Sequence, residues 1–195
     1  MKMLRRLRTV KVGDCLVLAS AVLLSGCASI VGSLTSGLAT NLSSAILESD
    51  DPVMIRDGAP AYLILIDSLL AGSPDSPQLL AQSAELHSAY AGAFVEEPER
   101  AIQLHSKAKT QMLYATCLSL KDACGLERRP FQEFSAWVDA QGPKSVPTLY
   151  NLGSIWAGWI QANSADFGAI GQLGRVKALI QRVAELEPEY ANGGA

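Results

Sequence analysis

The sequence predicts an all-α protein made of antiparallel helical hairpins, and three observations support this fold class. Apolar residues recur every three or four positions along most of the chain, which is the period of an amphipathic helix. Alternating runs of Val, Ile and Thr, which are typical of strands, are scarce. Prolines stand where successive helices would begin, a position at which the missing amide proton costs nothing.

The first 26 residues predict a signal peptide rather than a membrane span. Five basic residues precede the apolar stretch Cys15–Leu24, which is about half of the ~20 residues that a spanning helix needs. The stretch leads into Leu24-Ser25-Gly26-Cys27, which resembles the lipobox of bacterial lipoproteins. In that motif the thiol takes the lipid and the chain is cut before the cysteine, so we expect Cys27 to anchor the mature protein. A cysteine that stands there by chance is the alternative.

The charge of the mature chain argues against nucleic acid as a partner. Residues 1–26 hold five of the 16 basic residues and one of the 19 acidic residues, which leaves a net charge of −7. No basic cluster remains, and polyanions would be repelled. By resemblance to lipoproteins of Gram-negative bacteria, Ala28 after the cysteine indicates sorting to the periplasmic face of the outer membrane.

Two further cysteines, Cys117 and Cys124, lie seven positions apart on either side of a predicted turn. In an oxidising compartment they are expected to form a disulfide, and two buried free thiols are the alternative. A metal site is not expected, because two cysteines and two distant histidines lack the paired spacing of zinc sites.

The segment 27–52 is expected to carry the lipid and a first amphipathic helix. Its apolar stripe steps by four residues and comprises Leu34, Leu38, Leu42 and Ile46. Asp50-Asp51-Pro52 ends this helix and begins the next, which we expect over residues 53–71 with a kink at Pro60.

The remaining helices of the predicted domain, 53–195, begin near prolines or polar caps. In chain order they are expected over residues 77–94, 98–120, a short stretch after Pro130, 147–161 and 166–186. Gln141-Gly142-Pro143 and Pro188 break the chain after two of them.

Small and bulky residues in these helices follow the pattern of tetratricopeptide (TPR) repeats, in which small residues let two helices approach and bulky ones fill the groove to the next hairpin. The best matches are Leu149, Leu152, Gly153 and Trp156 in one helix and Val176, Ile180 and Val183 in its partner. Residues 121–146 fit poorly. The sequence therefore predicts a degenerate TPR-like solenoid.

No catalytic residues are expected. His87 and His105 fall where a TPR repeat places a packing aromatic residue, and the acidic run Glu96–Glu99 sits where it complements a helix dipole. The sequence has no HExxH, G-x-S-x-G or glycine-rich phosphate loop.

The stretch 156–164, WAGWIQANS, has two interpretations. At helical spacing Trp156, Trp159 and Asn163 share one face, where they could line a ligand cavity or a partner groove. Alternatively, Trp156 lies in the core, Trp159 packs between hairpins and Asn163 caps the next helix.

Several segments together resemble the TPR-containing T component associated with TRAP transporters, over nearly all of the mature chain. They are the lipobox, residues 55–63 (IRDGAPAYL), residues 88–95 (SAYAGAFV), Cys124-Gly125 and residues 156–164. The resemblance implies a non-catalytic periplasmic lipoprotein without cofactor that docks the solute-binding protein of a TRAP system. It also implies a homo-oligomer, by resemblance a trimer, that helps small, apolar ligands reach that protein.

On this basis, ligand or partner binding is assigned to Tyr62, Tyr90, Trp156, Trp159 and Asn163. A general TPR scaffold for envelope assembly is the alternative function. Members of the family run through additional helices, so we expect the solenoid to lack its C-terminal repeats.

Overall fold

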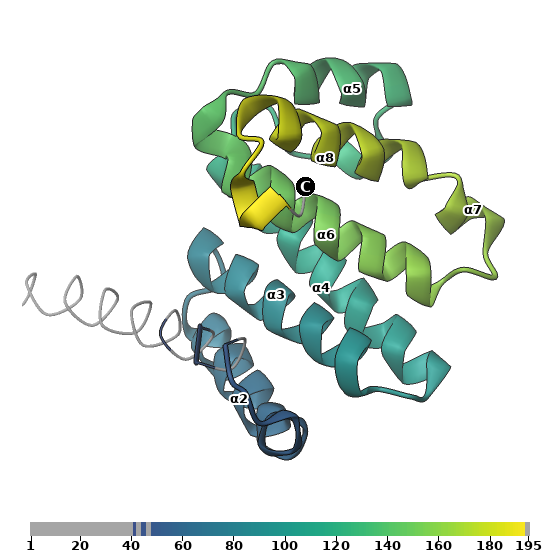
Figure 1. Ribbon diagram of the computed structural model, residues 1–195. Coiled ribbons are helices and arrows are strands. Elements are labelled where there is room, and N and C mark those ends of the chain that lie inside the picture. Colours follow the sequence, from purple (N-terminus) through teal and green to yellow (C-terminus); the bar gives the residue numbers. More distant parts are fainter. Residues whose placement is uncertain (1–40, 42–43, 46–47, 194–195) are drawn as a thin grey trace, which may run out of the picture. The chain divides into compact units, whose positions relative to one another are not determined.

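The structure, a computed structural model, describes residues 41, 44–45 and 48–193. Over these residues it is helical, with short 3-10 turns and no strand, which confirms the predicted all-α class (Figure 1). The lipobox and the stripe from Leu34 to Ile46 lie outside the described residues.

The helices match most of the predicted boundaries. They are α2 (Pro52–Gly72), α3 (Pro77–Phe94), α4 (Pro98–Ser119), α5 (Phe131–Asp139), α6 (Val146–Ala162), α7 (Phe167–Ile170) and α8 (Leu173–Leu186). The helix expected over 166–186 is two helices, because the chain turns at Gly171 and Gln172, where glycine weakens helix propensity.

Local chemistry explains where the helices begin. Pro52, Pro77 and Pro98 occupy the first turns of α2, α3 and α4. The Asp51 carboxylate accepts hydrogen bonds from the amides of Val53 and Met54, both at 3.0 Å, and so satisfies donors that the helix leaves open.

The helices pack in a chain of neighbours. The hairpin of α3 and α4 lies side by side with α2 on one side and α6 on the other, and α8 packs on α6 with α5 beyond it (Figure 1). This pairing of α3 with α4 and of α6 with α8 is consistent with the predicted TPR-like arrangement.

The buried residues form two clusters. The larger one lies among α4, α5, α6 and α8 and is centred on Trp156, Phe134 and Met112, none of which is more than 1% exposed. The smaller one lies between α2 and α3 and includes Leu63, Ile66, Leu86 and Tyr90. Thus α2 is attached to the hairpin through its own small core.

Cys117 and Cys124 are joined by a disulfide, with their Cα atoms 4.4 Å apart. The bridge ties the end of α4 to the turn that leads into the 3-10 helix Leu126–Arg128. Gly125 follows with φ +75°, a left-handed conformation that favours glycine.

Gly153 is a point of close approach between α6 and α8. A Cβ atom placed there would lie 2.7 Å from Ile180 Cδ1 and 3.4 Å from Leu179 Cβ. Gly153→Ala is therefore expected to lower the free energy of unfolding by about 1–3 kcal/mol, because either the Ile180 side chain must shift or the helices must separate.

The matched control is Gly92→Ala. Gly92 lies in α3 with no atom within 4 Å of its would-be Cβ, so alanine there should raise stability by about 0.5–1 kcal/mol through its higher helix propensity. Urea denaturation followed by circular dichroism measures both variants. Equal shifts in the same direction would mean that α6 and α8 do not pack through Gly153.

Candidate functional site

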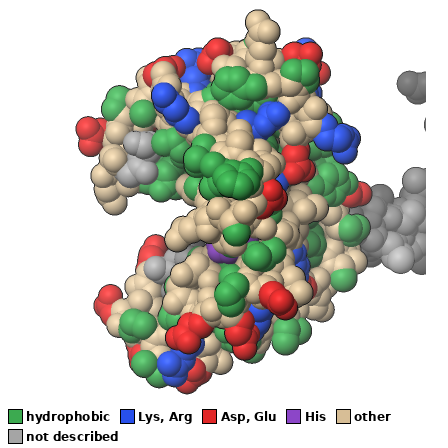
Figure 2. All heavy atoms as spheres, turned by 90° about the vertical axis from the view of Figure 1, so that its right-hand side faces the viewer, with side chains coloured by type: hydrophobic (Ala, Val, Ile, Leu, Met, Phe, Trp, Pro, Cys, Tyr) green, Lys and Arg blue, Asp and Glu red, His purple; other side chains and the backbone are tan. Residues whose placement is uncertain are grey.

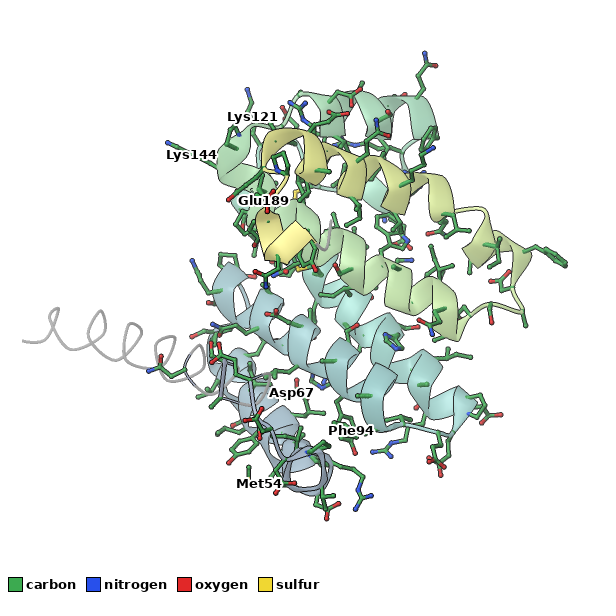
Figure 3. The ribbon with its side chains drawn as sticks, in the orientation of Figure 1. Met54, Asp67, Phe94, Lys121, Lys144 and Glu189 are labelled. Carbon is green, nitrogen blue, oxygen red and sulfur yellow. A yellow bond between two sulfur atoms is a disulfide. The ribbon has the colours of Figure 1, made fainter. Side chains whose placement is uncertain are left out.

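The two histidines are buried between helices, where their rings contact neighbouring side chains. His87 is 3% exposed, and its Nδ1 donates to the Ser83 carbonyl at 2.7 Å. Its Nε2 accepts from Lys107 Nζ at 3.0 Å, and Lys107 in turn pairs with Asp67 on α2. Asp67 extends from α2 toward the hairpin, so this polar cluster links α2 to α3 and α4 (Figure 3). Burial lowers the pKa of His87, which favours the neutral imidazole that this hydrogen bonding requires.

His105 lies where α4 meets α3 and α6. Its Nδ1 lies 3.3 Å from Ser88 Oγ on α3. A Cβ atom at Gly158 of α6 would come within 2.9 Å of the imidazole Cε1, so only glycine leaves room for the ring. Burial lowers the pKa of His105 as well.

Trp156 is buried in the large core. It is 0% exposed, its ring meets Phe134 edge-on at 5.9 Å, and its Nε1 donates to Gln172 Oε1 at 2.9 Å. Bulk, ring contact and hydrogen bond together make it the side chain around which α5, α6 and the turn before α8 pack.

Trp159 and Asn163 belong to a polar arrangement beside that core. The Lys109 ammonium lies 3.4 Å from the centroid of the Trp159 ring and pairs with Glu127 at 2.6 Å. Trp159 Nε1 donates to Ser106 Oγ at 3.1 Å, and Asn163 donates to the Trp159 carbonyl at 2.8 Å as the C-cap of α6. The Trp159 indole is therefore held by Lys109 at its face and by Ser106 at its ring nitrogen.

A groove of about 760 Å³ lies between α3 and α6. The space-filling view shows a hollow with a histidine side chain at its bottom, and His105 is the histidine that lines the groove (Figure 2). The lining is rich in small side chains, among them Ser88, Ala89, Gly92, Ala93, Ser154 and Gly158. Because these side chains are short, the two helices leave an open channel between them.

A smaller cavity of about 220 Å³ lies between α2 and α3. Its walls are mainly apolar and include both Tyr62 and Tyr90, with Phe94 at the end of α3 on one side (Figure 3). The structure thus brings together two tyrosines that are 28 positions apart in the sequence.

Comparison with known proteins identifies the family. A family model described as TRAP transporter T-component matches residues 48–195, which is most of the chain. The chain belongs to the TRAP transporter T-component family. This membership confirms the resemblance seen in the sequence and the accessory role in a TRAP transporter that it implies. No match was found among curated proteins.

The site residues predicted for this T component fall into two groups. Tyr62 and Tyr90 meet in the small cavity, whereas Trp156 and Trp159 are not among the described residues that line either the cavity or the groove. Asn163 caps the end of α6. A binding role for all five residues stays a prediction.

The sequence did not predict the ion pair between Lys109 and Glu127. Lys109 is 5% exposed and stands in a helix of ordinary amphipathic pattern, so no local signal marks it as buried. Its partners Glu127 and Trp159 come from other elements, and only their packing reveals the pair.

Residues 41, 44–45 and 48–193 contain no group of three or more His, Cys, Asp or Glu placed to hold a metal ion. Within the same ranges, no helix has the length and hydropathy that crossing a membrane requires.

Proposed function

We propose that this T component is a lipid-anchored, non-catalytic protein that docks the periplasmic solute-binding protein of its TRAP transporter through the groove between α3 and α6. Docked in this way, it helps to deliver small ligands to that protein. Family membership supports the transporter association, and the groove is the observation that supports the docking surface.

The groove suits a protruding segment of a folded partner. Its volume of about 760 Å³ equals that of clefts that hold drug-sized molecules, roughly 300–1,000 Å³, so a few side chains of a partner fit into it. Rigid helices form both walls, with α4 and His105 at the base, so little conformational entropy is lost when a partner enters. Mixed polar and apolar side chains, such as Ser88, Ile155 and Gln161, allow hydrogen bonds beside apolar contact.

Isothermal titration calorimetry tests the proposal. A solute-binding protein of a TRAP transporter from the same organism is titrated into the lipid-free protein, and a binding protein of an unrelated transporter serves as control. Saturable micromolar binding of the first alone supports the proposal. Equal binding of both would favour a general TPR scaffold, and binding of neither would contradict docking.

The lipid anchor is part of the same proposal and lies outside the described residues. Cys27→Ser is expected to move the protein from the membrane pellet to the soluble periplasmic fraction, because the thiol that takes the lipid is lost. Immunoblotting of fractions from the native host measures this, with Cys15→Ser as control. Pellet retention of Cys27→Ser would place the anchor elsewhere.

A homotrimer, implied by resemblance, is also proposed for this protein. Sedimentation-velocity analysis of the lipid-free form should then show a single species at three times the monomer mass. A monomer throughout the micromolar range would contradict this.

A further inference from the structure

We propose that the cavity between α2 and α3 binds a small neutral ligand: a single ring or short chain that carries one hydroxyl or carbonyl group. This inference deepens the ligand-delivery part of the proposed function and rests on it. Four observations support it, and they concern size, access, a phenol and charge.

The size of the cavity limits the ligand. Its volume is about 220 Å³, whereas an apolar protein cavity of about 150 Å³ holds benzene. A ring with one or two substituents therefore fits within the cavity, and a larger molecule would have to extend past its open rim. The walls are apolar, with Ile55, Ala59 and Leu63 from α2 and Leu86 from α3.

Access comes from the α3 side. Ala89 and Ala93 line the cavity one helical turn apart, and both side chains are exposed. Since alanine is the smallest side chain beyond glycine, the rim stays open at these two positions. A large side chain at Ala93 would close it without disturbing a buried residue.

Tyr90 supplies the polar contact. It is 8% exposed, and its ring contacts that of Phe94 at a tilt of 46°, with 5.8 Å between the ring centroids. No residue in the described part of the chain makes a hydrogen bond with its hydroxyl, although the ring lines the cavity. The Tyr90 hydroxyl is not among the buried polar atoms that lack a partner in the described part of the chain, so it reaches solvent. A ligand that covered it without a hydrogen bond would lose about 1–3 kcal/mol, so a ligand with one hydrogen-bonding group is favoured there.

The charges near the cavity favour a neutral ligand. Among the described lining residues there is no Lys, Arg, Asp or Glu. Two arginines on the described helices near it are already paired, Arg56 with Asp57 at 2.9 Å and Arg100, which lies over the Tyr90 ring, with Glu97 at 4.0 Å. A carboxylate in the cavity would lose its hydration without gaining a free counter-ion.

The test uses three probes of one size: benzyl alcohol, toluene and benzoate. Binding to the full chain is measured by ligand-detected NMR titration. Benzyl alcohol is expected to bind most tightly and benzoate at least tenfold more weakly.

Two variants distinguish the contribution of the Tyr90 hydroxyl to binding from that of the cavity space. Tyr90→Phe should weaken benzyl alcohol binding about tenfold and leave toluene unchanged, because only a hydrogen bond is removed. Ala93→Phe should abolish binding of both. Tyr150→Phe is the matched control, since Tyr150 lines the groove instead, and it should behave as wild type.

Three results would overturn the inference: no saturation by benzyl alcohol, benzoate binding as tightly as benzyl alcohol, or wild-type binding by Ala93→Phe. If Ala93→Phe changed the oligomeric state seen by sedimentation but still bound the ligand, the rim would be a contact with a second copy of the chain. That result would also contradict the inference. Wild-type protein that binds its solute-binding protein but no probe refutes this inference alone. Wild-type protein that binds the probes but not its solute-binding protein refutes docking and leaves the ligand-binding role of the cavity in place.

Discussion

Replacing Trp156 by alanine is expected to lower the free energy of unfolding by about 3–5 kcal/mol, the usual cost of deleting a large buried aromatic side chain. The ring is fully buried, meets Phe134 edge-on at 5.9 Å and donates to Gln172 at 2.9 Å. Its removal leaves a cavity in the core and an amide acceptor without its donor. Three helical elements meet there, so the surrounding side chains can close the space only in part.

The urea midpoint, followed by circular dichroism, measures this loss. Phe167→Ala is the matched control, because Phe167 is 91% exposed and its truncation should change stability by no more than about 0.5 kcal/mol. Equal midpoints for the two variants would show that the helices are not organised around Trp156.

Placing a tryptophan at Ser154 is expected to weaken binding of the solute-binding protein about 100-fold, because the indole fills the groove where a partner residue would anchor. Ser154 lies on α6, is exposed and lines the groove. Because the new side chain points into an open channel rather than a core, the stability of the chain should change little.

Gln103→Trp is the matched control for this second variant. Gln103 is exposed on α4 and is not among the described residues of the groove. Titration calorimetry should give the wild-type affinity for Gln103→Trp and the 100-fold loss only for Ser154→Trp. The same affinity in both variants would mean that the partner binds another surface.

The sequence was sufficient to predict where helices begin when local chemistry decides their boundaries. Pro52, Pro77 and Pro98 mark helix starts because proline has no amide proton to leave unpaired there. The break between α7 and α8 escaped prediction, since a single glycine at position 171 lowers helix propensity without deciding where the chain turns.

The site was less predictable, because its character depends on contacts between distant segments. Helical spacing correctly puts Trp156 and Trp159 on related faces of α6, yet whether that face is open depends on Lys109 and Ser106 of α4. Tyr62 and Tyr90 share a cavity only because α2 packs on α3, and no pattern within either helix reveals that pairing.

Amide hydrogen exchange of the chain with and without its solute-binding protein tests the central claim most directly. The central claim is that the groove between α3 and α6 is the docking surface of this T component. We predict that bound partner slows exchange in residues 88–95 and 151–162, which border the groove, and leaves α5 and α8 unchanged. Protection confined to α5 and α8, with none along the groove, would contradict it.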